Sequence, residues 1–317
     1  MSAFLGLILF AQTSLGSPAG GRPQECAGLD GAHGANVWER AKSPALRRYC
    51  DLLASGASKL AGTVMIADGS SADPRRVQNL KDVLAIADEA DHAVAGKAAP
   101  SVLRGRAFAR LGEFPKAYAA LHDAKGRDDR ALEDPVALLA WGRVALRTGH
   151  LAEANEAYHM LLPRASALQA ADRGVAYLEA GMMAMSRGTG DLEEAIQIFR
   201  QARRDSQDVA QTVAVLALAL ALDRSGEREE ARAVLSERIH SDPHGVLSDA
   251  RARQILGPAS GESEIEALAA LALEPLDANL ARESWRKYLE KSPLPAWAEH
   301  ARAHEAALGG GRGGKHK

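Results

Sequence analysis

Two histidines near the C-terminus, His300 and His304, have a spacing that could hold a metal ion. Residues four apart on a helix share one face, so both imidazoles could reach the same cation. A zinc protease helix has a glutamate directly after its first histidine, whereas Ala301 stands there, and the sequence shows no third ligand. We therefore interpret both histidines as solvent-exposed and predict no metal site.

Sequence motifs of catalysis do not stand out in this chain. It has no phosphate-binding Gly-x-x-x-x-Gly-Lys-Ser/Thr and no Gly-x-Ser-x-Gly, and residues 257–261 place Ser260 at the wrong position for the latter. Carboxylates gather at 88–91 beside His92, but a charged run on an amphipathic helix is usually its solvated side. We predict no catalytic residue, no enzymatic activity and no cofactor.

The two cysteines, Cys26 and Cys50, lie close together in the N-terminal part of the chain. In an exported protein we expect them to form a disulfide, which for a loop of this length stabilises a fold by about 3 kcal/mol in the chain-entropy account. In a reducing compartment they are two inert thiols. Neither Cys-x-x-Cys nor Cys-x-x-Cys-His occurs, so redox catalysis and covalent haem have no support.

The first sixteen residues contain no charged side chain and include a short apolar run at 3–11. Together with the small residues that follow, this resembles a secretory signal peptide, although a basic residue near the start is missing. The run is too short to cross a bilayer, which needs about 20 residues. We expect an exported, periplasmic or extracellular protein, and the alternative is an apolar tail on a cytosolic one.

Composition narrows the class of protein and of partner. The chain has 317 residues, of which 46% are hydrophobic and only 4% aromatic, and this balance suits helices packed through alanine and leucine. A formal charge of −2 gives no support to a nucleic-acid partner, which usually requires a basic domain. Arginine outnumbers lysine throughout, so no single arginine is distinctive by type alone.

A periodic pattern of small residues indicates which elements position these side chains. Four times a glycine is followed after five residues by alanine and after four more by a large apolar residue: Gly112/Ala117/Leu121, Gly149/Ala154/Tyr158, Gly190/Ala195/Phe199 and Gly226/Ala231/Leu235. A fifth instance, Ala281 and Trp285, lacks the glycine. The glycines lie 37, 41 and 36 residues apart, a period typical of stacked helical hairpins, and the third unit carries a two-residue insertion near Gly188. The glycine ends the first helix in a left-handed conformation, and the alanine lets the second helix approach it closely.

The order of Gly142, Gly149, Leu151, Ala154 and Tyr158 resembles the tetratricopeptide repeat family, whose unit has about 34 residues. The resemblance covers about residues 99–293. It implies an all-α fold, a right-handed α-solenoid of stacked antiparallel helix pairs, whose members bind unrelated proteins and peptides.

The repeats and the Pro/Gly punctuation divide the chain into segments. We expect a signal peptide at 1–16, a linker at 17–34, an N-terminal helical cap at 35–98, repeats at 99–293, a polar C-terminal capping helix at 294–308 and a disordered tail at 309–317. Inside the repeats we expect an irregular insertion at 243–263 with a soft loop at 257–261. The stretch 213–222 is apolar nearly all round and is predicted to form a buried helix.

The resemblance also implies a concave groove lined by the first helix of each unit. The positions that would face it carry Arg106, Arg110, Arg143, Arg147, Met182, Met185 and Arg224. One hypothesis is that the arginines bind the carboxylates of an extended segment while the methionines adapt to its apolar end. The alternative is that an arginine-rich chain carries arginines on every solvated face, paired with nearby acids.

These observations favour a non-catalytic scaffold that binds protein or peptide in the cell envelope. The first alternative is a helical accessory module of a separate envelope or cell-wall enzyme. The second is a cytosolic tetratricopeptide-repeat regulator, which applies if the N-terminus is retained. The sequence predicts no nucleic-acid partner and no stable membrane span.

Overall fold

The computed structural model describes residues 26, 44–61, 73–237, 243–291 and 293–310. These residues form helices and connecting turns, and none of them lies in a β-strand. None of their helices is both long enough and apolar enough to traverse a bilayer. The expected signal peptide, almost all of the expected linker and residues 311–317 of the expected tail lie outside the described residues.

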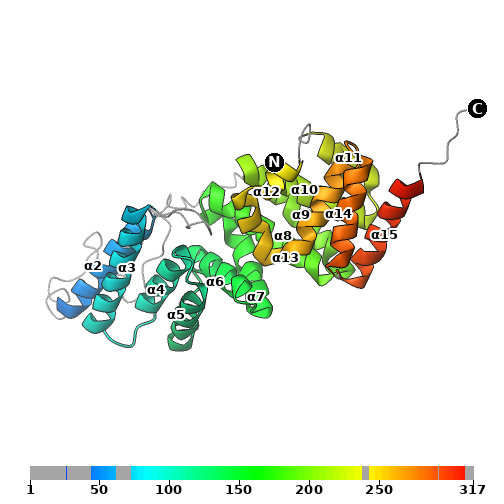
Figure 1. Ribbon diagram of the computed structural model, residues 1–317. Helices are drawn as coiled ribbons and strands as arrows, with labels where there is room; N and C mark the ends of the chain where they lie inside the picture. The colour runs from blue at the N-terminus through cyan, green and yellow to red at the C-terminus, as the bar shows by residue number, and fades with distance from the viewer. Residues whose placement is uncertain (1–25, 27–43, 62–72, 238–242, 292, 311–317) are drawn as a thin grey trace, which may run out of the picture.

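The helices follow one another as antiparallel pairs (Figure 1). Their bounds are α2 Pro44–Ala61, α3 Pro74–Ala93, α4 Ala99–Arg110, α5 Phe114–Arg127, α6 Pro135–Arg147, α7 Leu151–Leu161, α8 Ala170–Arg187, α9 Leu192–Asp205, α10 Asp208–Ser225, α11 Arg228–Ser236, α12 Pro243–Ser248, α13 Ala250–Leu273, α14 Ala278–Glu290 and α15 Pro295–Gly310. Short 3-10 turns, η2 Leu162–Ala167 and η3 Thr189–Asp191, precede α8 and α9. The fold is the predicted all-α solenoid.

Local sequence explains where several helices begin. Proline stands in the first turn of α3, α4, α5 and α6, where its missing N–H costs nothing. Asp73, Asp134 and Asp277 cap α3, α6 and α14, because each carboxylate accepts hydrogen bonds from backbone N–H groups of the first turn.

Glycines with positive φ end the first helix of the first four units. They are Gly112, Gly149, Gly188 and Gly226, with φ between 77° and 117°. In the third unit the sequence pattern pointed to Gly190, which is wrong for the turn. The two-residue insertion forms the 3-10 turn η3, so Gly188 ends α8 and Gly190 lies within η3.

Small residues on the first helix receive a large side chain from the second. A Cβ atom added at Gly105 would lie 2.4 Å from Leu121, and one added at Gly181 would lie 2.5 Å from Phe199. At Gly142 the same atom would lie 3.1 Å from the ring of Tyr158. These contacts hold α4 to α5, α8 to α9 and α6 to α7.

Helix α10 is buried at every residue from Val213 to Asp223, as predicted from its apolar sequence. Helix α13 differs from the prediction, because residues 257–261 belong to this helix and do not form a loop. Buried residues on both sides of them, including Leu256 and Leu268, pack in the same core cluster as α8 and α10. Tertiary packing therefore overrides the helix-breaking preference of the Gly257–Pro258 pair.

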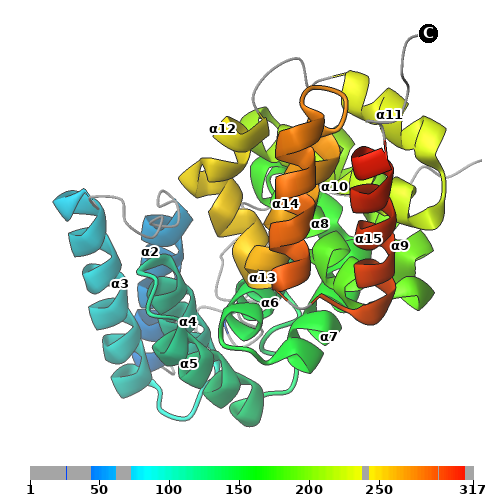
Figure 2. The ribbon, with the colours of Figure 1, turned by 45° about the vertical axis from the view of Figure 1, so that its right-hand side comes forward.

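The C-terminal helices fold back onto the repeats. Helix α13 contacts α8, α10 and α6, and Figure 2 shows it lying across α8 and beside α6. The indole of Trp297 in α15 donates a hydrogen bond to the carbonyl oxygen of Met185 in α8, 3.2 Å away. Part of the surface that the first helices would present as a groove is therefore covered by the chain itself.

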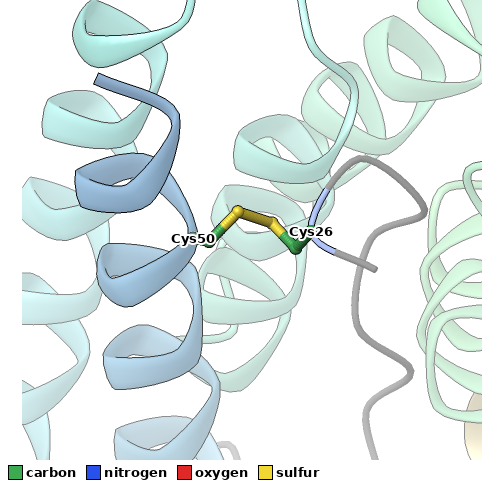
Figure 3. The surroundings of a disulfide bond; sticks show 2 residues. All are labelled: Cys26 and Cys50. Carbon is green, nitrogen blue, oxygen red and sulfur yellow. A yellow bond between two sulfur atoms is a disulfide. The ribbon is translucent and has the colours of Figure 1, made fainter. Parts of the chain in front are cut away.

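A disulfide joins Cys26 to Cys50 on α2, with the two Cα atoms 5.7 Å apart (Figure 3). Both cysteines are buried in the N-terminal core cluster with Tyr49, Leu53 and Leu80. The bond closes a loop with a sequence separation of 24 and attaches the segment at Cys26 to the first helix pair.

Candidate functional site

The two predicted groove arginines of the second unit bind a buried carboxylate from the next unit. Arg143 Nε lies 2.9 Å from Glu179 Oε2, and Arg147 Nη1 lies 3.7 Å from Glu179 Oε1. The hydroxyl of Tyr158 also donates to Glu179, at 2.8 Å. Glu179 is 1% exposed, so these groups form an internal network that joins α6 and α7 to α8.

Electrostatics in this network favours the charged pair. Burial acts to lower the pKa of Arg143, but Glu179 and Asp172 outweigh it and raise that pKa above its ordinary value. Burial raises the pKa of Tyr158 well above its ordinary value, and Glu179 adds to the effect. Arg143 and Glu179 therefore hold adjacent units together, and the prediction that Arg143 and Arg147 line an open groove is wrong in this respect.

Arg224 of the fourth unit is also internal. Its side chain is 0% exposed, and Nη1 lies 2.8 Å from Glu264 Oε2 on α13. Its Nη2 atom donates to the Tyr288 hydroxyl at 2.9 Å, and its guanidinium lies 4.5 Å from the ring centre of Trp297. Burial raises the pKa of Tyr288, with Arg224 acting against the shift and Glu264 adding to it. The predicted ligand-binding position of Arg224 is wrong because α13, α14 and α15 enclose it.

The predicted apolar end of the groove is enclosed as well. Met182 and Met185 are each 0% exposed and belong to the main core cluster. The same cluster includes Leu268 and Trp297 from the C-terminal helices. These methionines therefore pack the interior, and the prediction that they contact a ligand is wrong.

The two remaining predicted arginines, Arg106 and Arg110, lie on α4 of the first unit. In the described part of the chain Arg106 has no ion-pair or hydrogen-bond partner. Burial lowers its pKa, although the carboxylates of Asp134 and Asp172 act in the opposite sense. Burial also lowers the pKa of Arg110 to about 10, and the charge of Arg106 contributes to this shift.

The burial of Arg106 and Arg110 thus makes it costly to keep their guanidinium groups charged. A carboxylate brought to Arg106 would relieve that cost and form a charge-assisted hydrogen bond, in bidentate form if the geometry permits. We call Arg106 and Arg110, with Asp134 and Asp172 beside them, the arginine face.

A second polar cluster joins α15 to the end of α10. His300 Nε2 lies 2.6 Å from Asp223 Oδ2, and His304 Nε2 lies 2.9 Å from the same oxygen. His304 Nδ1 lies 2.6 Å from Oε1 of Glu274, just after α13. The prediction that both histidines are solvent-exposed is wrong, because α15 turns them toward the core instead of forming a purely polar cap.

Burial and mutual hydrogen bonds shift the pKa values of all three groups in this cluster. Burial acts to lower the pKa of His304, but hydrogen bonds with Asp223 and Glu274 outweigh it and raise the value to about 9. Burial lowers the pKa of His300 despite the neighbouring Asp223. Burial acts to raise the pKa of Asp223, but hydrogen bonds from both histidines hold it well below its ordinary value.

The sequence reasoning missed the carboxylates that enclose the arginines. Glu179 stands in an apolar helix between Leu178 and Ala180, and Glu264 lies just inside the apolar stretch that ends α13. An isolated acid on a buried helix face is rarely left unpaired, so both positions carried a signal for an internal partner. Asp223 gave a similar signal at the end of α10.

Comparison with known proteins matches one part of the chain to a known family. Residues 187–259 match the sequence profile described as "Tetratricopeptide repeat", a stretch that runs from the end of α8 into α13. No curated protein sequence matches the chain. Nine solved chains match, among them one titled "Functional Characterization of Pseudomonas Aeruginosa pilF". That match has 13% identity and a TM-score of 0.41, and covers 83% of this chain and 99% of the other.

Proposed function

We propose that this chain, whose residues 187–259 match the tetratricopeptide repeat profile, is a non-catalytic scaffold that binds a protein or peptide partner. A stack of helical hairpins presents an extended surface formed by successive units. A cavity between α7, α8 and α9 has a volume of about 10 Å³, space for a single water molecule, and a larger hollow of about 510 Å³ over residues 226–230 is open to solvent. This architecture suits contact with another chain better than enclosure of a small substrate.

The observation that carries the proposal further is Arg106, a desolvated cation without an ion-pair partner among the described residues. We infer that the arginine face receives an acidic group of the partner. Arg143 and Arg224 cannot do so without first breaking their buried pairs with Glu179 and Glu264. We therefore propose that the partner binds at the first unit and its border with the second.

We also propose that the scaffold works outside the cytoplasm, in the cell envelope. The support is the uncharged apolar N-terminus together with the buried Cys26–Cys50 disulfide. Structural disulfides form and persist mainly in oxidising compartments. Mass spectrometry of the native N-terminus tests this location, and a chain that retains Met1 and reduced cysteines would contradict it.

Affinity capture from an envelope extract tests the arginine face. The bait is the wild-type chain, with Arg106→Glu as the test variant and Arg76→Glu, an exposed arginine of α3, as the matched charge reversal. We expect the same partner with wild type and Arg76→Glu, and at least about tenfold less with Arg106→Glu, because a lost charged hydrogen bond costs about 1.5–3 kcal/mol. Equal recovery with both variants would refute the proposed surface.

A further inference from the structure

The histidine cluster at the C-terminal end of the solenoid has the form of a metal site. Asp223, His300 and His304 offer one ligand atom each, and these atoms all lie within 4.8 Å of one another. We propose that these three side chains bind one divalent transition-metal ion, of which Zn²⁺ fits best, and that the ion fastens α15 to the end of α10.

Asp223, His300 and His304 direct one ligand atom each toward a common point. The Nε2 atoms of both histidines approach the same oxygen, Asp223 Oδ2. The Nε2 atom of His304 is buried and lies 2.9 Å from the same oxygen. The ligand atoms of a bound cation gather around one point in this way.

A carboxylate on the far side of the ring orients His304. Glu274 Oε1 lies 2.6 Å from His304 Nδ1 and accepts a second hydrogen bond from the indole of Trp285, at 2.9 Å. With the proton on Nδ1, the neutral ring presents the lone pair of Nε2 toward Asp223. Histidines that bind metals usually have their other ring nitrogen held by a carboxylate or carbonyl in this way.

The surroundings restrict the movement of both rings. The ring centres of His300 and His304 lie 4.6 Å apart, and that of Trp285 lies 5.8 Å and 5.0 Å from them respectively. The two histidines are four residues apart on α15, so the helix itself fixes their spacing. Asp223 occupies the last turn of α10, immediately before the turn that contains Gly226.

The chemistry of the three ligand groups indicates which class of ion they would bind. Two imidazoles and a carboxylate are typical ligands of Zn²⁺, at about 2.0–2.2 Å from the metal, which places tetrahedral ligands about 3.4 Å apart. The contacts to Asp223 Oδ2 are shorter, 2.6 and 2.9 Å, so small side-chain rotations are needed to admit the ion. Arg228 lies 3.9 Å from the other oxygen of Asp223, but it is exposed and free to turn into solvent.

The alternative occupant of this site is a proton. An imidazolium at His304, placed between Asp223 and Glu274, would satisfy the same carboxylates without any metal. The metal-binding form and the protonated form can be distinguished by experiment. Only the metal-binding form takes up Zn²⁺ stoichiometrically, and this uptake depends on both histidines.

Isothermal titration of the full chain with Zn²⁺, after chelator treatment, distinguishes these states. The variants are His300→Asn, Asp223→Asn and Glu274→Gln, with His122→Asn, an exposed histidine of α5, as the matched control. We expect one bound ion in wild type and His122→Asn, an affinity at least about 100-fold lower in the first two variants, and about 10- to 100-fold lower in Glu274→Gln. Equal Zn²⁺ binding by wild type and His300→Asn, or none by wild type, would overturn the proposal and leave the proton as the occupant.

A second measurement does not depend on the variants being folded. Crystals of the wild-type chain grown with Zn²⁺ should show an anomalous peak at the zinc absorption edge between the three side chains. A peak only at other histidines, or no peak, contradicts the assignment. Neither result bears on partner binding at the arginine face, which lies on other helices.

Discussion

The arginines on the first helices of the units perform two different tasks. Arg143 and Arg224 are buried against Glu179 and Glu264, and each pair joins two units. Arg106 stands at the repeat position of Arg143 but has no such paired carboxylate among the described residues. Removing one partner of a buried pair leaves an uncompensated charge, whereas removing an unpaired cation does not.

Neutralising Arg143 should therefore reduce the stability of the protein much more than neutralising Arg106. We expect Arg143→Gln to lower the free energy of unfolding by about 3 kcal/mol, because Glu179 loses its closest cation. Arg106→Gln should change it by less than about 1 kcal/mol while weakening partner binding. Urea unfolding followed by circular dichroism measures both variants. A large loss of stability in Arg106→Gln would show that this arginine is structural as well.

At the scale of elements, close contact between a glycine and a large side chain holds each hairpin together. Gly105, Gly142 and Gly181 occur where the opposite helix inserts Leu121, Tyr158 and Phe199. Ion pairs between successive second helices add to this packing, as between Arg200 of α9 and Glu230 of α11. Hairpin packing and contacts between units thus rest on largely different residues, with Tyr158 contributing to both.

Adding a single methyl group tests the glycine contact. In Gly181→Ala the new Cβ would lie 2.5 Å from Phe199, so we expect a destabilisation of about 1–3 kcal/mol from overpacking. Gly126→Ala is the matched control, because no atom outside its local helix backbone lies within 4 Å of that position and alanine favours the helix by about 0.5–1 kcal/mol. Adding Phe199→Leu to Gly181→Ala should restore part of the loss. Thermal unfolding of the four proteins measures these effects, and equal midpoints for the two alanine variants would contradict the packing account.

The stability that the protein gains from the packing of α3 on the first unit should depend on pH. Asp91 of α3 accepts hydrogen bonds from Arg104 at 2.8 Å and Arg127 at 3.1 Å. Burial acts to raise the pKa of Asp91, but the two arginines outweigh it and lower the value. A carboxylate with a lowered folded-state pKa stabilises the protein above its unfolded value of about 3.9, and this contribution disappears as the pH falls toward the folded value.

We accordingly expect Asp91→Asn to be less stable than wild type by about 1 kcal/mol at neutral pH. The difference should shrink as the pH is lowered from about 6 to about 3, because the wild-type carboxylate becomes protonated. Urea unfolding at a series of pH values measures it. The difference should also be small at every pH when Arg104 and Arg127 are both replaced by glutamine, and its persistence there would assign the effect to another group.

The elements determined by local signals could be predicted from sequence, and those determined by distant contacts could not. A three-residue turn centred on Gly149 separates α6 from α7, and both helices lie where the repeat placed them. By contrast, the burial of Met185 depends on Trp297, which is 112 residues further along the chain. The continuation of α13 through Gly257 likewise depends on packing against α8 and α10. The repeat therefore placed each arginine on its helix, but distant partners decided which of them stayed accessible. These partners are Glu179 of the next unit for Arg143 and Arg147, and the C-terminal helices for Arg224.

The whole molecule is a solenoid fastened at both ends. At the N-terminal end a disulfide joins Cys26 to α2, and at the C-terminal end Asp223, His300 and His304 join α10 to α15. Terminal units of a solenoid lack a neighbour on one side, so additional links there oppose fraying. Between the two ends, α13 and α15 cover the first helices of the third and fourth units and leave the arginine face on the first.

Loss of the disulfide should destabilise the N-terminal end. For the Cys26→Ser/Cys50→Ser variant we expect about 3 kcal/mol less stability than for the oxidised wild type, since the closed loop has a sequence separation of 24. Wild type treated with a reductant should behave like the variant. Urea unfolding of the three samples measures this, and an oxidised wild type no more stable than the variant would contradict it.

Hydrogen–deuterium exchange of the chain alone and in complex with its captured partner tests the central claim most directly. We predict additional protection on α4 and at the start of α6, which carry Arg106, Arg110 and Asp134, with little change on α11 and α14. Protection confined to α11, α14 or α15, with α4 unchanged, would show that the partner binds another surface and would contradict the account.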